Sequence, residues 1–595
     1  MIDPYNIYKS YFDAIGGIDN FMAELSSYFE ADITCAGLQG TLRVWQRLPL
    51  CERRELNLQV VNQTEGDNGQ VKWSVDTNGK LSLQEDENTL KRREIRRLDN
   101  QLDFLDRKSL TFTLTFKGIE KFKNKDCYVI EKANRINNDI YEVYIDTGNL
   151  LVVKEIKHDN VDITHSEFSD YRKVGSVLRP FRIDVIEQPV GNEMITQITK
   201  YEVNSDIDEK LFDPPKQVTR DYEFLDGNSS ENIPFEYSLD HIFVFGEVAG
   251  RKSKWLLDTG ASATIIDSAF AAGLGVESEG ALEGRGASNT VSVSFAKMPH
   301  LKLAGLELKE QTVASLDMQS MLRKTGWHEV VGILGYDFIS RFVIKVDYAN
   351  RVMAIFDPAA FNYSGKGQIL DMPLRSNKPM IRASVEGKFS GMWQVDIGAG
   401  NCDFMYPFAE RSGFLERQGI ERTSVDAGGM CADRDVQFKS FELGGFVIEK
   451  PIISFPTTNV SGGFRDTESV GNLGNDILRH FIVWFDYGNQ RMILEKGIDF
   501  SKKFPYDKSG ISAFFNSDDL LEVKAVSANT PGAEAGIKIH DIILAINHTK
   551  ISYPDGRRIF KDLMAAEEGT KYKMSIKRGQ QVLDIDLVLH ELYDK

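Results

Sequence analysis

The sequence has no long hydrophobic run, few cysteines and too little positive charge for several classes of protein. No segment reaches the roughly 18 consecutive apolar residues of a membrane-spanning helix, so no transmembrane segment is predicted. Five cysteines among 595 residues, none in a C-x-x-C pair, predict neither a disulfide scaffold nor a metal site. With 71 Lys and Arg against 88 Asp and Glu residues, the formal net charge is −17. This charge disfavours a general binder of nucleic acid or of anionic membranes.

Short motifs of several common enzyme classes are missing as well. The sequence contains no H-E-x-x-H pair, no G-x-S-x-G elbow and no G-x-x-x-x-G-K-[ST] loop. The sequence therefore does not support a zinc peptidase with an H-E-x-x-H motif, a serine hydrolase with a G-x-S-x-G motif or a P-loop nucleotide hydrolase. No cofactor and no metal ion is expected.

The composition is that of a globular protein with several domains. Hydrophobic residues make up 42% and charged residues 27% of the chain. Its length predicts about three to five domains. Apolar residues alternate with period two in several segments, for example over 110–116, as in half-buried strands. We therefore predict a mainly β, multidomain fold. The predicted domains are 1–220, 233–358, 371–497 and 509–592, and the polar stretch 217–233 is interpreted as a linker.

An internal duplication is the most informative feature of the chain. Residues 255–262 read W-L-L-D-T-G-A-S, and residues 393–400 read W-Q-V-D-I-G-A-G. G-I-L-G at 332–335 is matched by G-N-L-G at 471–474, and F-V-I-K-V-D-Y at 342–348 by F-I-V-W-F-D-Y at 481–487. All three pairs are separated by 138 or 139 residues. Such constant spacing indicates two copies of one structural unit.

Each copy places an aspartate at the end of a predicted strand. Gly260 and Gly398 allow a tight turn after Asp258 and Asp396. Two such turns facing each other would bring the carboxylates together. Because like charges at short range do not ionise together, such a pair holds one proton. The carboxylate then acts as a base that activates water, and the carboxylic acid protonates a carbonyl oxygen. This chemistry hydrolyses peptide bonds without a metal ion.

These motifs resemble those of the retropepsin-like aspartic proteases, over about residues 235–497. The resemblance implies that Asp258 and Asp396 are catalytic, and that the two copies form an intramolecular pseudo-dimer, as in pepsin-like enzymes. It also implies active-site turns, a supporting apolar-apolar-Gly motif and flaps that close over a polypeptide substrate. The turns would contain Thr259, Gly260, Ala261, Ile397, Gly398 and Ala399, the supporting motif Ile333, Leu334, Gly335, Leu473 and Gly474, and the flaps Gly284, Arg285, Gly286, Gly428 and Gly429.

The second copy departs from this pattern at two positions. Ile397 replaces the Thr or Ser whose hydroxyl braces the opposite turn, and Asn472 replaces an apolar residue. We expect both changes to loosen the pair of aspartates. Alanine follows the turn in both copies, at Ala261 and Ala399. Since no hydroxyl there stabilises a charged carboxylate, we expect a pH optimum of about 5 to 6.5. A third D-T-G triplet at 146–148 lacks the supporting motif and is interpreted as a plain turn.

The C-terminal segment resembles the PDZ domains of bacterial proteases. The residues that carry the resemblance run from Val523 to Ile543 and include T-P-G-A-E-A-G at 530–536. Such domains bind a peptide as an added strand and hold its terminal carboxylate with backbone N–H groups. The resemblance implies a groove whose carboxylate loop is formed by Gly510, Ile511, Ser512, Ala513 and Phe514, with Ile559, Leu563 and Met564 on the facing helix. A PDZ fold without a peptide site is the alternative.

The N-terminal segment more loosely resembles the lipoprotein-carrier-like domains of the Gram-negative envelope. F-S-D-Y at 168–171, L-R-P-F at 178–181 and Y-E-V-N at 201–204 carry this resemblance. It implies an α+β half-barrel with a concave face suited to an apolar chain. A predicted amphipathic helix near residues 90–105 carries a basic cluster at 91–97, which we expect to be a solvated face.

Together these features predict an aspartic endopeptidase whose PDZ domain binds a substrate tail or a partner's C-terminal peptide. Two alternatives remain. One is a peptide-binding pseudo-protease with a degenerate second copy, and the other is a lipid- or lipoprotein-binding envelope protein. The flanking resemblances favour a bacterial, periplasmic or otherwise exported location, with a cytoplasmic one still open. The sequence predicts neither the cleavage-site preference nor the oligomeric state.

Overall fold

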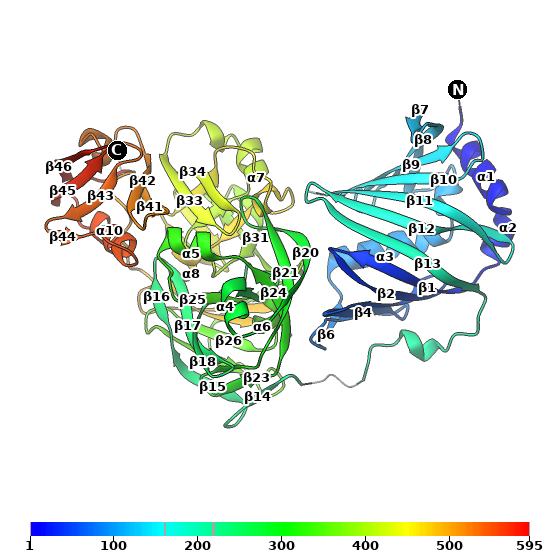
Figure 1. The fold of residues 1–595 in the computed structure, drawn as a ribbon, viewed down its shortest axis with the longest axis horizontal. Helices are drawn as coiled ribbons and strands as arrows, with labels where there is room; N and C mark the ends of the chain where they lie inside the picture. The colour runs from blue at the N-terminus through cyan, green and yellow to red at the C-terminus, as the bar shows by residue number, and fades with distance from the viewer. Residues whose placement is uncertain (1, 160–161, 217–219, 594–595) are drawn as a thin grey trace. The chain divides into compact units, whose positions relative to one another are not determined.

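The computed structural model describes residues 2–159, 162–216 and 220–593. These residues form two compact units, each described by itself (Figure 1). The first unit comprises the residues up to Asp221 together with Glu279–Glu283 and Ser292–Phe295, and the second comprises the rest. Both are mainly β, as predicted, and neither contains a closed barrel. None of the described helices is long and apolar enough to cross a bilayer.

The first unit is built on one antiparallel sheet of 13 strands. The strand order is β6-β5-β4-β3-β2-β1-β13-β12-β11-β10-β9-β8-β7, so that the first and last strands of the unit pair in the middle of the sheet. The elements are α1 (Pro4–Ile15), α2 (Ile18–Met22), β1 (Ser26–Cys35), β2 (Leu38–Arg47), β3 (Cys51–Leu58), β4 (Val61–Asp67), β5 (Lys72–Val75), β6 (Leu81–Gln84), α3 (Glu87–Asn100), η1 (Asp103–Leu105), β7 (Phe112–Phe122), β8 (Lys125–Asn134), β9 (Ile140–Asp146), β10 (Val152–His158), β11 (Ile163–Val174), β12 (Val177–Gln188), β13 (Asn192–Val203) and η2 (Glu209–Phe212).

Helices α1 and α3 cover one face of this sheet. Asp3 caps the start of α1 through the N–H of Tyr5, and a proline occupies the first helical turn, where no N–H is needed. The buried face of α1, including Tyr8 and Phe12, packs against residues of β7, β8 and β9. Ile95 and Leu98 of α3 join the same cluster, so the predicted amphipathic helix is present.

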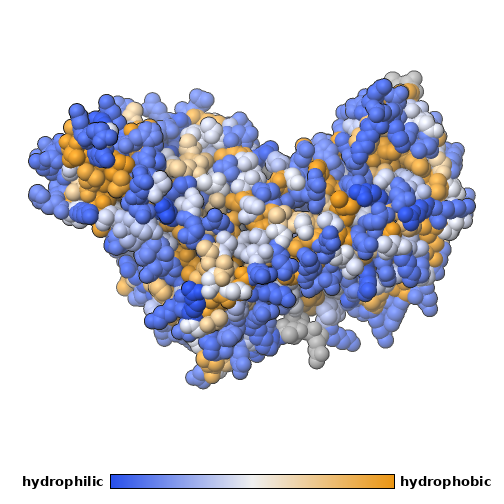
Figure 2. Space-filling model, in the orientation of Figure 1, coloured by the Kyte–Doolittle hydropathy of each residue, from blue (hydrophilic) through white to orange (hydrophobic). Residues whose placement is uncertain are grey.

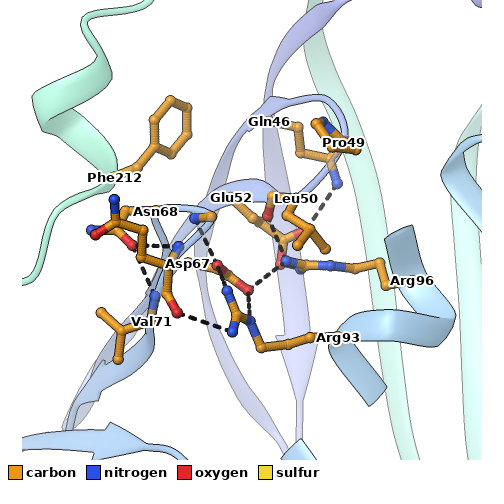
Figure 3. Close-up of polar contacts among 12 residues, drawn as sticks. Gln46, Pro49, Leu50, Glu52, Asp67, Asn68, Val71, Arg93, Arg96 and Phe212 are labelled. Atoms are coloured by element: carbon orange, nitrogen blue, oxygen red, sulfur yellow. Dashed lines mark hydrogen bonds and ion pairs between the residues drawn. The ribbon is translucent and has the colours of Figure 1, made fainter. Parts of the chain in front are cut away.

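The basic cluster of α3 is only in part the solvated face that its charge suggested. The side chains of Lys91 and Arg92 are 43% and 55% exposed, whereas Arg93 and Arg96 bind a buried carboxylate. Arg93 Nε lies 2.8 Å from a carboxylate oxygen of Asp67, and Arg96 Nη2 lies 3.0 Å from the same carboxylate (Figure 3). The Asp67 side chain is only 1% exposed. Burying a carboxylate costs desolvation free energy, which is offset only when charged donors bind the carboxylate. The two arginines therefore fasten α3 to the end of β4.

The second unit contains two lobes that share a six-stranded sheet, β15-β27-β26-β39-β40-β28. The elements of the first lobe are β14 (Tyr222–Phe224), β15 (Ser229–Pro234), β16 (Glu236–Ser238), β17 (His241–Val248), β18 (Arg251–Leu257), β19 (Ile265–Asp267), α4 (Ser268–Gly273), β20 (Ser278–Arg285), β21 (Thr290–Met298), β22 (Leu301–Leu303), β23 (Leu306–Leu308), β24 (Gln311–Leu316), α5 (Gln319–Thr325), β25 (Val330–Leu334), α6 (Tyr336–Ile339), β26 (Val343–Asp347) and β27 (Val352–Phe356).

The second lobe repeats this order. Its elements are β28 (Gln368–Asp371), β29 (Leu374–Arg375), β30 (Lys378–Val385), β31 (Phe389–Val395), β32 (Cys402–Phe404), α7 (Tyr406–Arg411), η3 (Phe414–Glu416), β33 (Ile420–Asp426), β34 (Gly429–Gln437), β35 (Ser440–Leu443), β36 (Phe446–Glu449), β37 (Ile452–Pro456), η4 (Gly463–Arg465), β38 (Gly471–Leu473), α8 (Asn475–Leu478), β39 (Phe481–Asp486) and β40 (Arg491–Lys496).

The shared sheet reveals how the two copies are related. Strands β26 and β39 pair antiparallel, from Val343 opposite Asp486 to Asp347 opposite Ile482. These strands are the corresponding segments of the two copies, so their register places a pseudo-twofold axis between them. One continuous hydrophobic core extends through both lobes, from Phe224 to Leu494. The predicted linker at 217–233 belongs partly to this body. Residues 217–219 lie outside the described residues, but β14 and β15 pair with β23 and β27.

The C-terminal part of the second unit has its own sheet and core. Its sheet order is β41-β42-β43-β45-β46, with β44 paired to β43, so that β41 is an edge strand. The elements are β41 (Ile511–Phe515), β42 (Leu521–Val526), α9 (Pro531–Glu534), β43 (Ile542–Ile546), β44 (Thr549–Lys550), α10 (Gly556–Met564), β45 (Lys571–Arg578) and β46 (Gln581–Val588). Charged and polar residues dominate the visible surface, with apolar residues in separate patches (Figure 2).

Replacing Asp67 with asparagine should destabilise the first unit. The substitution keeps the shape of the side chain but leaves Arg93 and Arg96 without their carboxylate. Because hydrogen bonds to charged groups contribute about 1.5–3 kcal/mol, we expect the free energy of unfolding to fall by about that amount. Urea unfolding of the full chain measures it. The control is Asp170→Asn, which removes an exposed pair with Arg172 and should change stability by less than about 0.5 kcal/mol. Equal effects of the two substitutions would contradict this role of Asp67.

Candidate active site

Two parallel strand pairs position the two aspartates. Strand β18 leads into Asp258 beside β25, and β31 leads into Asp396 beside β38. The N–H of Asp258 donates to the carbonyl oxygen of Leu334 at 3.0 Å, and the N–H of Asp396 donates to that of Leu473 at 2.9 Å. The supporting motif of each copy therefore lies directly beside its own aspartate turn, in the same arrangement in both lobes.

The glycines of the supporting motifs allow this close approach. A Cβ atom added to Gly335 would overlap the carbonyl oxygen of Ala263, and one added to Gly474 would overlap that of Asn401. No side chain fits at either position, so the apolar-apolar-Gly pattern follows from the packing of the turn on the strand.

The two aspartate turns face each other across the pseudo-twofold axis. A Cβ atom at Gly260 would lie 2.5 Å from the carboxyl carbon of Asp396, and one at Gly398 would overlap that of Asp258. Each carboxyl group thus lies against the glycine of the opposite turn, and the two carboxyl groups hydrogen-bond to each other. Burial and the neighbouring Asp396 carboxyl raise the pKa of Asp258 well above its ordinary value. The pair is therefore suited to hold one proton.

Each carboxyl group also accepts hydrogen bonds from its surroundings. Asp258 Oδ1 accepts from the N–H groups of Gly260 at 2.7 Å and Ala261 at 3.0 Å. Asp396 Oδ1 accepts from the N–H of Gly398 at 2.9 Å. Asp396 Oδ2 accepts from Nδ2 of Asn472 at 2.7 Å. The expectation that Asn472 loosens the pair is therefore wrong, because its amide binds the carboxylate directly.

The replacement of Thr by Ile397 is also compensated. Thr259 Oγ1 donates to the carbonyl oxygen of Val395 at 2.8 Å and accepts from the N–H of Ile397 at 3.0 Å. The second turn is held from below by Asn475, whose Nδ2 donates to the carbonyl oxygen of Ile397 at 2.8 Å. Tyr348 fixes Asn475 by donating to its Oδ1 at 2.7 Å. Sequence reasoning missed Asn475, although its place directly after the second supporting motif was a signal.

The predicted flap residues lie at the tips of two hairpins that touch each other. Asn289 Nδ2, after β20, donates to the carbonyl oxygen of Gly428 at 3.1 Å, and the N–H of Ser288 donates to Asp426 at 3.1 Å. A third segment holds the first tip, since the N–H groups of Gly462 and Gly463 donate to the carbonyl oxygens of Ser288 and Gly286. This third segment was not predicted from the sequence.

Among the described residues, no group of three or more His, Cys, Asp or Glu side chains is arranged to hold a metal ion.

The third D-T-G triplet lies in the turn between β9 and β10. There Asp146 accepts from the N–H of Gly148 at 2.8 Å and pairs with Lys125 at 2.9 Å. Its structure is that of a plain turn.

The carboxylate loop of the C-terminal part already has a carboxylate bound to it. The N–H groups of Ser509 and Gly510 donate to Asp507 at 3.1 and 2.9 Å. The N–H of Ile511 donates to Oγ of Ser509 at 3.1 Å. Because each N–H offers a single hydrogen, a peptide carboxylate binds this loop only after Asp507 leaves. The N–H groups of Ser509 and Gly510, at the start of the predicted carboxylate loop, are therefore already occupied by the chain itself.

Asp507 also ties this loop to the second flap. Arg422 of β33 lies 2.7 Å from Asp507 and 3.0 Å from Asp435. The N–H of Thr423, also in β33, donates to Oγ of Ser512 in β41 at 3.2 Å. The edge strand of the C-terminal part is thus docked on the strand that carries the second flap.

A cavity of about 880 Å³ lies between β41 and the second lobe. Ile511, Ser512, Ala513 and Phe514 line it as predicted for a groove, together with Phe560 of α10. Of the residues predicted on the facing helix, Ile559 and Leu563 instead pack partly buried against the core of this domain, and Met564 lies within that core. The helix therefore presents a different face to the cavity from the one predicted.

Comparison with known proteins agrees with two of these parts. Residues 244–338 match the family model described as aspartyl protease, and residues 508–589 match that of the PDZ domain. The chain contains an aspartyl protease domain and a PDZ domain. The protease match covers the first copy, up to Phe338. A search of curated proteins found no match to the chain.

Solved structures similar to the chain include an aspartic proteinase, a lipoprotein-sorting protein domain and a LolA superfamily protein. An aspartic proteinase from Irpex lacteus is 14% identical with a TM-score of 0.31, covering 46% of this chain and 99% of its own. An outer membrane lipoprotein-sorting protein domain from Vibrio parahaemolyticus is 10% identical with a TM-score of 0.25, covering 35% and 95%. A LolA superfamily protein from Nitrosomonas europaea is 11% identical with a TM-score of 0.25, covering 36% and 99%. Because all three TM-scores lie below 0.5, the site is interpreted from its own geometry.

Substituting Asp507 with alanine should open the carboxylate loop of the PDZ domain. The freed N–H groups of Ser509 and Gly510 then bind the carboxylate of a peptide C-terminus. We expect at least about tenfold tighter binding of a fluorescent pool of peptides with apolar C-terminal residues, since a hydrogen bond to a charged group contributes that much. Fluorescence anisotropy measures the affinity, and the same peptides with an amidated C-terminus should not respond.

The matched control is Lys561→Ala. This variant removes the ion pair between Lys561 and Asp240 at the same docking surface but leaves Asp507 in the loop. Its affinity for the peptide pool should equal that of the wild type. An unchanged affinity in the Asp507 variant would contradict the role assigned to this carboxylate.

Proposed function

We propose that the chain is an aspartic endopeptidase that completes its active site within one molecule. The observation that carries the proposal is the hydrogen-bonded pair of Asp258 and Asp396 between two symmetric turns. Burial of this pair makes a doubly charged state unfavourable, so one carboxyl group stays protonated.

In the proposed reaction, a water molecule binds between the two carboxyl groups. The charged carboxylate takes a proton from the water, whose oxygen attacks the peptide carbonyl carbon, while the protonated carboxyl donates to the carbonyl oxygen. The resulting tetrahedral diol then collapses. One diol hydroxyl returns its proton to the charged carboxylate as the C–N bond breaks, and the leaving amine takes up the proton held by the other carboxyl group, so that the pair ends singly protonated. This reaction needs neither a covalent enzyme intermediate nor a metal ion.

The flaps and the PDZ domain would control access to this site. The flap tips contact each other through Asn289 and Gly428, so that substrate entry requires their separation. The PDZ domain is docked on β33 of the second flap. Binding of a peptide tail to the PDZ domain would therefore affect that strand. Substrates are therefore polypeptides long enough to reach both places. A periplasmic or otherwise exported location in a bacterial cell stays a prediction.

The Asp258→Asn variant should lose peptide cleavage while keeping its fold. Asparagine keeps the shape of the side chain but cannot share a proton with Asp396. We expect hydrolysis of a peptide library to fall at least about a thousandfold, within the range by which such groups accelerate reactions. The control is Asp146→Asn, which changes the aspartate of the third D-T-G triplet and should leave the rate unchanged.

The same assay, carried out from pH 3 to 8, tests the shared proton. Because the pKa of Asp258 is raised, the singly protonated pair persists to higher pH and is lost as pH rises through that raised value. We expect a bell-shaped profile with its maximum at about pH 5 to 6.5. Full activity of Asp258→Asn would refute the proposal. Folded wild type that captures peptides without cleaving them would instead support a pseudo-protease.

A second binding function is favoured by a cavity in the first unit. The cavity has a volume of about 370 Å³, and both aromatic and charged side chains line it, the charged ones being Glu24, Asp99, Lys132, Glu155 and Arg179. Burial raises the pKa of the Glu155 carboxyl, and Lys132 acts in the opposite direction. We infer that this cavity binds an amphiphile with an apolar body and a hydrogen-bonding head. The aromatic residues that line it are Tyr8, Tyr11, Phe12, Phe21, Phe104, Phe168, Tyr171 and Tyr201.

Filling this cavity with a large side chain should abolish amphiphile binding. Val152 lies at its wall, and Val152→Trp places an indole in the space that the ligand would occupy. We expect the full chain to bind a fluorescent fatty acid and the variant to lose at least about tenfold in affinity. Val582→Trp, on an exposed strand of the PDZ domain, is the control. Equal binding by all three proteins would contradict a ligand site here.

A further inference from the structure

The two supporting motifs differ at one position, and the difference points at the active site. Ile333 of β25 is 6% exposed and packs in a hydrophobic cluster with Phe243 and Leu256. Its counterpart Asn472 of β38 is 5% exposed and directs its amide to Asp396. Among the described residues, Oδ1 of this amide is buried without a hydrogen-bond partner. A buried amide oxygen without a hydrogen-bond partner lowers the free energy of unfolding. The hydrogen bond from Nδ2 of Asn472 to Asp396 offsets this loss.

The bond makes the two carboxyl groups unequal. Each Oδ1 atom accepts from the backbone of its own turn, through Gly260 and Ala261 in one copy and Gly398 in the other. Asp396 Oδ2 has an additional donor, Asn472 Nδ2, at 2.7 Å. At Asp258 Oδ2, the described residues provide no N–H donor. A carboxylate with the extra donor is the one that better carries the negative charge.

We propose that Asn472 is a positioning residue that keeps Asp396 charged and thereby places the shared proton on Asp258. This inference rests on the proposed function and assigns its roles. Asp396 takes the proton from the attacking water, and Asp258 protonates the carbonyl oxygen of the substrate. The first copy provides no such donor because Ile333 occupies the corresponding position. The assignment therefore follows from a single difference between two otherwise matching turns.

Other titratable groups also face the pair. Lys378 of β30 interacts with both carboxylates, with Asp396 more strongly than with Asp258, and burial lowers its pKa. Tyr487, after β39, also faces both, and burial raises its pKa so that it stays neutral. Asp403 of β32 interacts with Asp396, and burial followed by the charge of Asp433 raises its own pKa. In its neutral form, Asp403 places no second negative charge beside Asp396.

The orientation of the amide is the point on which the inference depends. If its oxygen faced Asp396, two acceptors would meet unless Asp396 carried the proton. The proton would then sit on the opposite carboxyl group from the one proposed. The experiments below separate these two arrangements.

The first experiment compares the pH profile of peptide cleavage in the wild type and in Asn472→Leu. Without the amide, the charged form of Asp396 is less stable, so activity is lost sooner as pH falls. We expect the acidic limb to move upward by about one to two pH units, the size of a lost hydrogen bond to a charged group, while the alkaline limb stays in place. Asn489→Leu, an exposed asparagine of the same lobe, is the matched control. An unmoved acidic limb, or both limbs moving together, would overturn the proposal.

The second experiment reads the charge without using proteolysis. Phenyl glycidyl ether is opened by an ionised carboxylate, whose oxygen attacks an epoxide carbon while the ring C–O bond breaks and the alkoxide takes a proton from water. Peptide mass spectrometry of the full chain then shows which aspartate is esterified. We expect label on Asp396 in the wild type and a shift toward Asp258 in Asn472→Leu.

This labelling also separates the two proposals. Preferential label on Asp396 without peptide cleavage would retain the role of Asn472 and refute the endopeptidase. Cleavage with label mainly on Asp258 would retain the endopeptidase and refute the role of Asn472. The wild-type labelling ratio decides the second point even where Asn472→Leu does not fold.

Discussion

The hydrogen bond between the carboxyl groups of Asp258 and Asp396 is the interaction on which the proposed activity depends. It forms because each carboxyl group lies where a side chain of the opposite turn would otherwise stand, at Gly260 and Gly398. The turns are held at this distance by the pairing of β26 with β39, which joins the two lobes into one body. The raised pKa of Asp258 is a consequence of that burial and of the neighbouring charge. Backbone packing, rather than any single catalytic side chain, thus creates the chemistry.

The same lobes connect the aspartate pair with the PDZ domain. Arg422 lies in the strand that leads to the second flap, and it binds Asp507, which fills the carboxylate loop of the PDZ domain. The flap tips in turn bind each other and the segment at 461–464. A peptide tail that displaces Asp507 removes an ion pair from the flap strand. In the proposed function, substrate recognition and access to the site therefore depend on one polar network.

The sequence predicted the part of this structure that repeats. A spacing of 138 or 139 residues between three pairs of motifs predicted two lobes, and the resemblance to aspartic proteases implied two facing aspartates. Residues that break the repeat were harder to interpret, because a departure from a pattern does not say what replaces it. Asn472 and Ile397 were expected to weaken the site. In the structure, Asn472 binds Asp396, and Asn475 holds the turn at Ile397.

Contacts between segments distant in the chain were also beyond prediction. Arg93 and Arg96 belong to a charged helix that resembles a solvated face in sequence, yet Asp67 lies more than 20 residues earlier and is buried beneath them. Asp507 stands only three positions before Gly510, where the predicted carboxylate loop begins, but the pattern of that loop does not reveal that a carboxylate already binds there. Pairing partners of this kind depend on the tertiary fold, which periodicity and motif spacing do not encode.

The most direct test of the central claim is a complementation assay with the two aspartate variants. Asp258→Asn and Asp396→Asn chains would be purified separately, unfolded and refolded together, and assayed for peptide cleavage against refolded wild type. If one chain supplies both carboxyl groups, every molecule in the mixture lacks half of its pair, and the mixture should remain inactive. Recovery of activity on mixing would contradict this account, because it would show that the working pair forms between two molecules.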